Sequence, residues 1–405
     1  MFARKVELQG HIIDEHILPR VFDAINAYNG DYTIEEFIVG RSKKDTSYAL
    51  LEVRAPSLDV LDKILKRLQA LGATIVAEDE VQLEAAPRDG AFPEGFYSTT
   101  NLDTFVLFQG QWLKAEGTEM DCGIVIDCDN AVARCVPVNQ VQAGDMVVVG
   151  RKGIKVLPLE RTYRKETFSF MGSAVSSERP KGLLIKEIAQ YMRQLKQDGK
   201  KILIVAGPAV IHTGAGKYLA RIIEAGYVDY LFAGNALAVH DIETALLGTS
   251  LGIYLDTGEG AAEGHAHHMR AINKIRLAGG IREAVKKGIV TSGVMYTCVT
   301  NDVDFILAGS IRDDGPLPDT ITDVLVAQAK MRQRVQNVDL VIMLGTMLHS
   351  IATGNLLPAR VRTVCVDINP AVVTKLADRG SFQTVGLVSD VEWFLRELAY
   401  RLDIK

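Results

Sequence analysis

The chain has 405 residues, of which 23% are charged, and its formal net charge is −5. This length is enough for two or three domains, and the weak acidic balance provides no basic surface for nucleic acid or an anionic membrane. No apolar stretch approaches the roughly 18 to 20 residues that span a bilayer, and the first residues are too polar for a secretory signal.

The five cysteines indicate a reducing compartment. Their number is odd, and most of them stand in apolar or strand-like runs, which suits buried thiols better than disulfides. The spacing C-x5-C-x6-C over residues 122–135 is not that of a zinc site, so we expect no metal ion. We therefore expect a soluble, cytoplasmic protein.

Residues 1–98 are expected to form a ferredoxin-like α+β unit. Residues 37–55 have the pattern of a β-hairpin, and Ser57 precedes an amphipathic helix whose apolar residues recur from Val60 to Leu68. The same pattern alone fits an amino-acid-sensing domain or an oligomerisation module equally well.

Residues 99–172 are expected to form a small β-rich unit, of barrel or sandwich type. Short β-prone runs alternate here with Gly, Asp and Asn, and no long helix fits the pattern. Residues 171–182 (MGSAVSSERPKG) are linker-like and lead into a third unit, predicted over residues 173–405.

The third unit alternates apolar runs with helical patterns. We expect helices from about residue 215 to 225 and around Asp241. Strands are expected in six apolar runs: KILIVAG (201–207), YVDYLFAG (227–234), LGIYLD (251–256), FILAG (305–309), LVIMLG (340–345) and TVCVDIN (363–369). This alternation predicts an α/β fold with a mostly parallel sheet covered on both faces.

Two of these runs end in loops that are typical of a nucleotide site. The run 341–344 ends at Gly345-Thr346, and the run 363–366 ends at Asp367-Ile368-Asn369. Parallel strands with such loops usually hold a dinucleotide at the carboxyl edge of an open sheet. Asp367 stands where an acidic residue accepts both ribose hydroxyls of the adenosine half; the alternative is a cap before Pro370.

The loop after residues 201–207 matches neither G-x-G-x-x-G nor a P-loop, because Ile211 and Leu219 stand where Gly is needed. Gly207 would still let backbone N–H groups approach an anion. The alternative is that it is only a turn glycine. Asn235 follows a strand end and would meet the pyrophosphate or nicotinamide ribose, or it is a left-handed turn residue. The candidate cofactor contacts are Gly207, Pro208, Gly234, Asn235, Ala236, Gly345, Thr346, Met347, Asp367, Ile368 and Asn369.

Several segments together resemble known NAD-binding proteins. GTMLHSIATGNLLP followed by VCVDINP resembles the GTSL and I-x-IN pair of sirtuins, and LFAGNALAVHDIE resembles the TAGG-x-EED-x-IK loop of deoxyhypusine synthase. GEGAAEGHAHHMRAIN and AGSIRDDGPLPDTITD resemble two further segments of deoxyhypusine synthase. The whole chain most closely resembles the archaeal and cyanobacterial type of ornithine cyclodeaminase. That family has an amino-terminal region named after lysine-oxoglutarate reductase/saccharopine dehydrogenase, ahead of an NAD-binding domain of deoxyhypusine synthase/sirtuin type.

The chain departs from both related enzymes in informative ways. The imine-forming lysine of deoxyhypusine synthase and the tryptophan two residues before it would fall on Val326 and Val324, which argues against transfer to a protein lysine. The cysteine zinc ribbon of sirtuins is missing, which argues against protein deacylation. The shared first chemistry is hydride abstraction by NAD+ from the carbon that bears a substrate amine.

For L-ornithine, the resemblance implies three steps. Hydride leaves Cα to give a 2-imine, the δ-amine attacks that carbon with loss of ammonia, and the same NADH returns hydride to give L-proline. A homo-oligomer is also implied, since deoxyhypusine-synthase-like domains often complete each other's sites. Another NAD-dependent amine or amino-acid oxidoreductase and a non-catalytic NAD or amino-acid sensor remain as alternatives.

Three residues are predicted to be catalytic. His267 matches the first His of the KHH segment of deoxyhypusine synthase, and its alternatives are a solvated loop histidine or a metal ligand. Asp313 and Asp314 follow a predicted strand and would bind the substrate ammonium or a cofactor ribose; alternatively they cap a turn.

Overall fold

The computed structural model contains two compact units, 1–166 and 167–405. No helix in the described part of the chain is long and apolar enough to cross a membrane. The residues that the structure describes are 2–10, 12–13, 17–40, 45, 47–75, 79–157, 181–261, 263–313, 315–378 and 384–404. Most of the predicted linker, and Asp314, lie outside these ranges.

The first unit begins with the predicted ferredoxin-like fold. Its antiparallel sheet has the strand order β2-β3-β1-β4, and two amphipathic helices pack their apolar faces against it. Helix α2 confirms the prediction, and the Ser57 hydroxyl accepts a hydrogen bond from Val60 N (3.3 Å). The predicted hairpin is present as β2–β3, but its first strand begins at Asp31, before the predicted range 37–55. Helix α1 has no counterpart among the predicted elements. The elements are β1 (Phe2–Gly10), α1 (Ile17–Asn26), β2 (Asp31–Ile38), β3 (Ser47–Ala55), α2 (Leu58–Ala70) and β4 (Thr74–Ile75).

The second part of this unit is β-rich, as predicted. Two sheets, β5-β10-β8-β9 and β11-β6-β7, share a core that includes Val106, Ile124 and Val148. The predicted boundary at residues 98/99 falls inside this part, because β5 pairs with β10 and Tyr97 N donates to Val148 O. The elements are β5 (Gln82–Ala85), β6 (Thr104–Phe108), β7 (Gln111–Lys114), β8 (Gly123–Asp127), β9 (Val132–Val136), η1 (Val138–Gln140), β10 (Met146–Val149) and β11 (Ile154–Val156).

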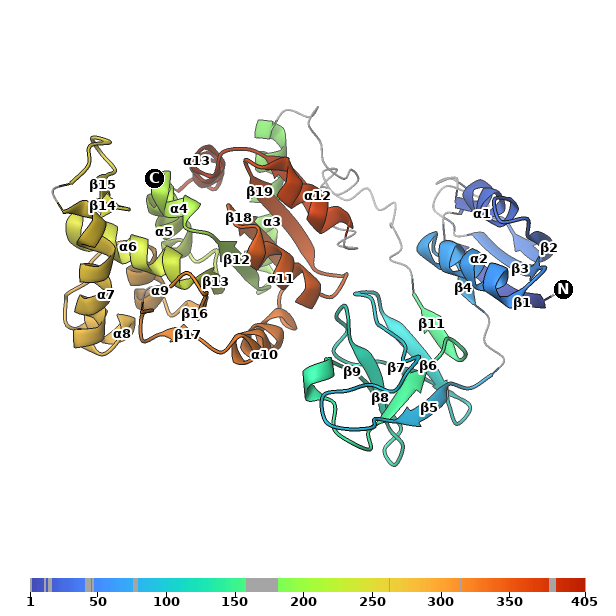
Figure 1. The fold of residues 1–405 in the computed structure, drawn as a ribbon. Helices are drawn as coiled ribbons and strands as arrows, with labels where there is room; N and C mark the ends of the chain where they lie inside the picture. The colour runs from blue at the N-terminus through green and yellow to red at the C-terminus, as the bar shows by residue number, and fades with distance from the viewer. Residues whose placement is uncertain are drawn as a thin grey trace. The chain divides into compact units, whose positions relative to one another are not determined.

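The second unit is built on a seven-stranded parallel sheet with the order β17-β16-β13-β12-β18-β19-β20 (Figure 1). Its strands are β12 (Ile202–Ala206), β13 (Tyr230–Gly234), β16 (Asp304–Ala308), β17 (Thr320–Ile321), β18 (Leu340–Leu344), β19 (Arg362–Asp367) and β20 (Thr384–Val388). Its helices are α3 (Lys181–Gln197), α4 (Ala209–His212), α5 (Gly216–Glu224), α6 (Asn235–Leu247), η3 (Gly264–Ala266), α7 (His267–Ala278), α8 (Ile281–Lys286), α9 (Val294–Thr300), α10 (Val324–Val335), α11 (Leu348–Leu356), α12 (Pro370–Asp378) and α13 (Val391–Arg401).

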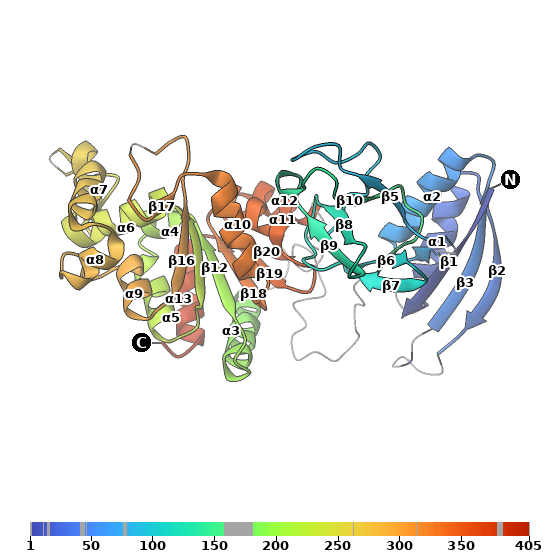
Figure 2. The same ribbon diagram turned by 90° about the horizontal axis from the view of Figure 1, so that it is seen from below.

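Helices cover both faces of this sheet, which explains why its strands are apolar throughout. Alternate residues of β12 point to opposite faces. Ile202 and Ile204 pack with residues of α3, α5 and α13, whereas Leu203 and Val205 pack with residues of α10, α11 and α12 (Figure 2). The predicted parallel sheet covered on both faces is therefore confirmed.

One predicted element is confirmed and one differs. The helix expected around Asp241 is α6, which begins at Asn235, directly after β13. The run LGIYLD forms part of a small hairpin, β14 (Thr249–Ser250) with β15 (Ile253–Tyr254), and joins no strand of the main sheet. The reason is local: Leu251 and Gly252 both have positive φ (52° and 72°), so the chain turns back on itself within the run.

Candidate active site

The centre of the parallel sheet has a reversal of strand order. From β12 the chain proceeds outward through β13 and β16, and from β18 it proceeds in the other direction through β19 and β20. In open α/β folds, ligands bind in the crevice outside the carboxyl ends of the strands at such a reversal. The reversal here falls between β12 and β18, whose carboxyl ends lead into the loops at Gly207 and Gly345.

These two loops lie in direct backbone contact. Gly207 N donates to Leu344 O (2.9 Å), and a Cβ atom on Gly207 would lie 2.2 Å from Gly345 O and 2.8 Å from Thr346 Cβ. Only glycine fits at residue 207. Gly345 itself has φ +56°, a left-handed conformation that favours glycine. The N–H groups of both glycines are used within the sheet edge, since Gly345 N donates to Val366 O (3.0 Å) in the same way.

The strand register brings predicted cofactor residues together from four strands. Ala206 pairs with Ala233 and with Leu344, and Leu344 pairs with Val366. The residues that follow these four in the chain therefore stand level at the carboxyl edge of the sheet. They are Gly207, Gly234, Gly345 and Asp367.

Asp367 ends β19 as a buried carboxylate. Its side chain is 8% exposed, and its Oδ1 atom accepts a hydrogen bond from Asn369 N (2.8 Å). Asn369 Oδ1 accepts in turn from Ala371 N (3.0 Å) at the start of α12, and Ile368 between them is 73% exposed. The turn therefore combines a cap with a carboxylate at the sheet edge, so the two interpretations of Asp367 are compatible.

Asn235 uses its side-chain carbonyl internally. Its Oδ1 atom accepts hydrogen bonds from Leu317 N and from the Thr320 hydroxyl, both 3.0 Å. This side chain braces the segment that leads into β17. A contact between Asn235 and a cofactor stays a prediction.

A histidine that the sequence patterns did not single out lies beside Gly234. A Cβ atom on Gly234 would lie 2.7 Å from His349 Cε1, so the absence of a side chain makes room for this ring. Burial lowers the pKa of His349, and the nearby charge of Asp313 partly opposes the shift. His349 stands on the first turn of α11, four residues after Gly345, and that position was the signal for it.

Asp313 follows β16 and closes a turn. Its Oδ2 atom accepts a hydrogen bond from Ser310 N (2.8 Å), as the turn interpretation expects, and it lies near enough to His349 to influence its pKa. Asp314, the third predicted catalytic residue, lies outside the described residues. Helix α11 also buries two hydroxyl groups, of Ser350 and Thr353, which have no hydrogen-bond partner among the residues that the structure describes.

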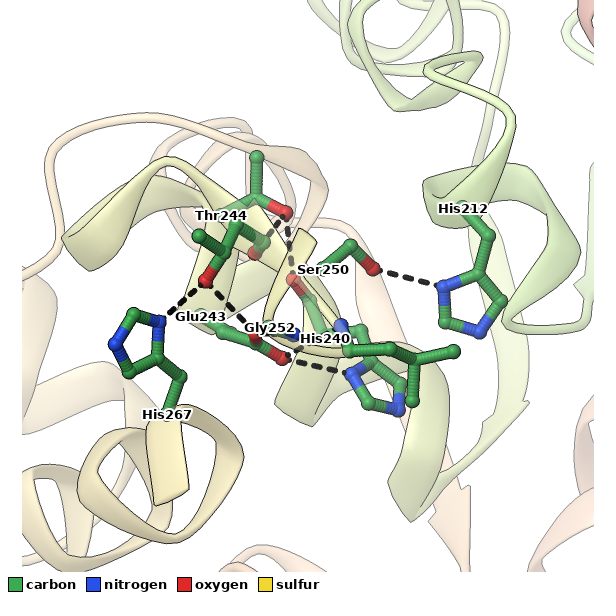
Figure 3. Close-up of polar contacts among 9 residues, drawn as sticks. His212, His240, Glu243, Thr244, Ser250, Gly252 and His267 are labelled. Atoms are coloured by element: carbon green, nitrogen blue, oxygen red, sulfur yellow. Dashed lines mark hydrogen bonds and ion pairs between the residues drawn. The ribbon is translucent and has the colours of Figure 1, made fainter. Parts of the chain in front are cut away.

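A second group of polar residues lies on and around α6. We call it the histidine cluster, and its members are His212, His240, Glu243, Thr249, Ser250 and His267. Figure 3 shows Glu243 between His240 and His267. His240 Nδ1 lies 2.9 Å from one Glu243 oxygen, and the Thr249 hydroxyl connects the other oxygen to His267 Nδ1 through two contacts of 2.8 Å. His212 Nδ1 contacts the Ser250 hydroxyl (2.7 Å), and the rings of His212 and His240 are 4.8 Å apart.

His267 is therefore not a solvated loop histidine. It is 7% exposed and begins α7, whereas His265 nearby is exposed. The described residues hold no group of three or more His, Cys, Asp or Glu side chains arranged for a metal ion.

Glu243 and His240 are candidate functional residues that the motif comparison did not identify. Both stand inside the segment LFAGNALAVHDIE, and residues three apart on a helix share a face. That spacing was the available signal for the pair. Their link to His267 depends on the hairpin after α6, which sequence periodicity does not predict.

Several observations fit a bound dinucleotide. Glycines stand at the ends of β12, β13 and β18, Asp367 places a carboxylate level with them at the end of β19, and α11, which follows the Gly345 loop, buries two hydroxyls that have no partner among the described residues. The fold and this edge define an α/β protein of the dinucleotide-binding class.

Comparison with known protein families supports this class. The family model described as "Arginine dihydrolase ArgZ-like, C-terminal, Rossmann fold" matches residues 186–398, and that of its first region matches residues 103–185. The model described as "LOR/SDH bifunctional enzyme conserved region" matches residues 3–102.

Relatives match along the whole chain. An ornithine cyclodeaminase of Methanothermobacter thermautotrophicus is 54% identical over 403 residues, 99% of this chain and 98% of that protein. The crystal structure of ArgZ, an arginine dihydrolase from cyanobacteria, has a TM-score of 0.84 at 40% identity and covers 99% of this chain. A ternary complex of AgrE with ornithine and NAD+ has a TM-score of 0.54 at 42% identity and also covers 99% of this chain.

This chain belongs to the ornithine cyclodeaminase family, as the sequence motifs predict. It spans 58% of the ArgZ chain and 57% of the AgrE chain.

Proposed function

We propose that this protein is an NAD-dependent ornithine cyclodeaminase that converts L-ornithine into L-proline and ammonia. The observation that carries the proposal is 54% identity to an ornithine cyclodeaminase over 98% of that protein's length. The row of strand-end residues at the sheet edge supports it independently. When bound, NAD+ supplies a hydride acceptor at Cα of ornithine and then the hydride donor that completes proline.

The loops at the strand reversal would hold the cofactor. The N–H groups of Gly207 and Gly345 already donate to Leu344 O and Val366 O, so the pyrophosphate would be bound by N–H groups of the residues that follow them in each loop. The Asp367 carboxylate would accept hydrogen bonds from the ribose hydroxyls of the adenosine half. The loop residues beside them would complete this contact, namely Pro208, Gly234, Asn235, Ala236, Thr346, Met347, Ile368 and Asn369.

Two groups of residues would handle the substrate. The α-ammonium must lose a proton before hydride leaves Cα, and the departing amine must gain one, so one acid–base residue can serve both steps. We assign this role to His267. Asp313 and Asp314 would bind the distal ammonium, and His349 would stay neutral beside Asp313 because burial lowers its pKa.

We also propose that the protein is cytoplasmic and homo-oligomeric, and that it links ornithine metabolism to proline synthesis. All five cysteines are free thiols, three of them buried, which suits a reducing compartment.

The test is turnover with little cofactor. The protein is incubated with L-ornithine and NAD+ at one-hundredth of the substrate concentration, and proline and ammonia are measured together. Equal amounts of both, in excess of the NAD+ added, would support the proposal. NADH formed in proportion to an oxidised product would indicate another amine oxidoreductase, and NAD+ binding without any product would indicate a sensor.

A further inference from the structure

The carboxylate of Glu243 is the centre of the histidine cluster. Its side chain is completely buried (0% exposed), yet four donors converge on its two oxygens. Oε1 accepts from the Thr249 hydroxyl (2.8 Å) and Gly252 N (2.9 Å). Oε2 accepts from His240 Nδ1 (2.9 Å) and Leu251 N (3.3 Å). All four acceptor positions of the carboxylate are therefore used.

Glu243 is ionised at neutral pH. Burial alone would raise its pKa, but hydrogen bonds from His240, Gly252 and Thr249 outweigh burial and hold the pKa below its ordinary value. An ionised carboxylate accepts hydrogen bonds and donates none. Every group that contacts it must therefore supply a proton.

This requirement fixes the proton positions on two histidine rings. His240 Nδ1 must carry a proton, because it faces the carboxylate directly. The single hydroxyl proton of Thr249 points to Glu243, so the contact between Thr249 Oγ1 and His267 Nδ1 needs the proton of His267. A neutral histidine carries a proton on only one ring nitrogen. When the two rings are neutral, the Nε2 atom of each is therefore left as a proton acceptor.

We propose that Glu243 is a positioning residue that holds His240 and His267 together in the Nδ1–H form, so that both present a bare Nε2 atom for proton transfer. The effect reaches His240 directly and His267 through the Thr249 hydroxyl. The catalytic consequence rests on the proposed function, in which His267 moves protons; the proton positions themselves do not. One buried carboxylate thus sets the acid–base state of two rings from different helices (Figure 3).

The sharpest test is Glu243→Gln, which replaces one oxygen by an NH2 group. That group cannot accept, so it must face one of the two donor pairs. The pair of His240 and Leu251 contains the longer contact (3.3 Å) and is the less costly one to lose. We therefore expect His240 to change to the Nε2–H form, while His267 keeps its Nδ1 proton.

The readout is the tautomer of each ring, measured by long-range ¹H–¹⁵N NMR on protein labelled at its eight histidines. Signals are assigned with His240→Gln and His267→Gln. Glu283→Gln on α8, where the carboxylate contacts the exposed Lys286, is the matched control and should change neither ring. Wild-type rings with protons on Nε2, or unchanged rings in a folded Glu243→Gln variant, would overturn the proposal.

A second pair of variants covers the case in which Glu243→Gln does not fold. Thr249→Val removes the hydroxyl that links His267 to Glu243 and should release His267 from the Nδ1–H form, with His240 unchanged. Thr249→Ser retains a hydroxyl and should restore the wild-type spectrum. A Thr249→Val spectrum identical to wild type would contradict the proposed link.

Kinetics separate this proposal from the proposed function. Outer residues that orient catalytic groups typically change activity by 10- to 100-fold, so Thr249→Val, which releases His267, should lower kcat by about that factor with little change in the Kd of NAD+. Glu243→Gln, which leaves His267 in the Nδ1–H form, should lower kcat less. If the variants change the tautomers but the wild-type protein makes no proline, the proposed function is overturned and the positioning role is supported. If the wild-type protein makes proline but the variants leave the tautomers unchanged, the positioning role is overturned and the proposed function is supported.

Discussion

Substitution of Gly207 by alanine tests the strand reversal as the cofactor site. The added Cβ would lie 2.2 Å from Gly345 O and 2.8 Å from Thr346 Cβ, whereas ordinary contacts of a Cβ atom lie at 3.4–4 Å. The nearest obstacle is backbone, so the two loops must separate by about 1 Å. Overpacking of this kind typically costs about 1 to 3 kcal/mol. For a unit of this size, that cost corresponds to a fall in Tm of roughly 2 to 12 °C.

The same displacement should weaken cofactor binding. Loss of one good hydrogen bond from a backbone N–H costs about 1.4 kcal/mol or more, so the Kd of NAD+ should rise at least about tenfold. The assays are thermal melts with and without NAD+ and isothermal titration calorimetry. Gly182→Ala, where a Cβ meets nothing within 4 Å, should melt at or slightly above the wild-type temperature. A Gly207→Ala protein with wild-type Tm and Kd would refute the tight contact between the loops.

Three further predictions concern single side chains. Asp367→Ala should raise the Kd of NAD+ by about 10- to 150-fold, the equivalent of a charge-assisted hydrogen bond worth roughly 1.5 to 3 kcal/mol, and an unchanged Kd in a folded variant would remove Asp367 from the site. His267→Ala should lower kcat by about 100- to 10,000-fold with unchanged NAD+ affinity, whereas the exposed His265→Ala should match wild type; equal rates for both would place the proton transfer elsewhere. Asp241 is buried, which raises its pKa to about 6, and it accepts from Val294 N and Met295 N at 2.8 Å. Because its folded pKa lies above the unfolded value, the stability it contributes is greatest in acid, and up to about 3 kcal/mol is lost as the pH rises from about 4 through 6. In urea unfolding, Asp241→Asn should therefore cost more at pH 5 than at pH 7.5, and an equal cost would contradict the raised pKa.

The parallel sheet and its strand-end loops could be predicted from sequence because each depends on local pattern. Apolar runs of β12, β18 and β19 are followed at once by the residues that form the edge, and parallel strands bring those residues together whatever the rest of the chain does. The helix cap at Ser57 could also be predicted, because a cap and its helix are adjacent in sequence.

The histidine cluster could not be predicted in the same way. His267 contacts Thr249 eighteen residues earlier, and that contact depends on the turn at Leu251 and Gly252. The apolar run LGIYLD has the pattern of a strand, so the sequence does not indicate this turn. The internal use of Asn235 is similar, since its partners Leu317 and Thr320 are more than eighty residues away. Hydrogen bonds between distant segments leave no periodic signal in the sequence.

The central claim is that hydride leaves and returns to the same substrate carbon within one active site. L-Ornithine deuterated at Cα is incubated with the protein and a trace of unlabelled NAD+, and the proline formed is analysed by mass spectrometry and NMR. Proline that retains deuterium at Cα is the predicted result, because a hydride held by the cofactor does not exchange with water. Proline with hydrogen from solvent at Cα would contradict the account.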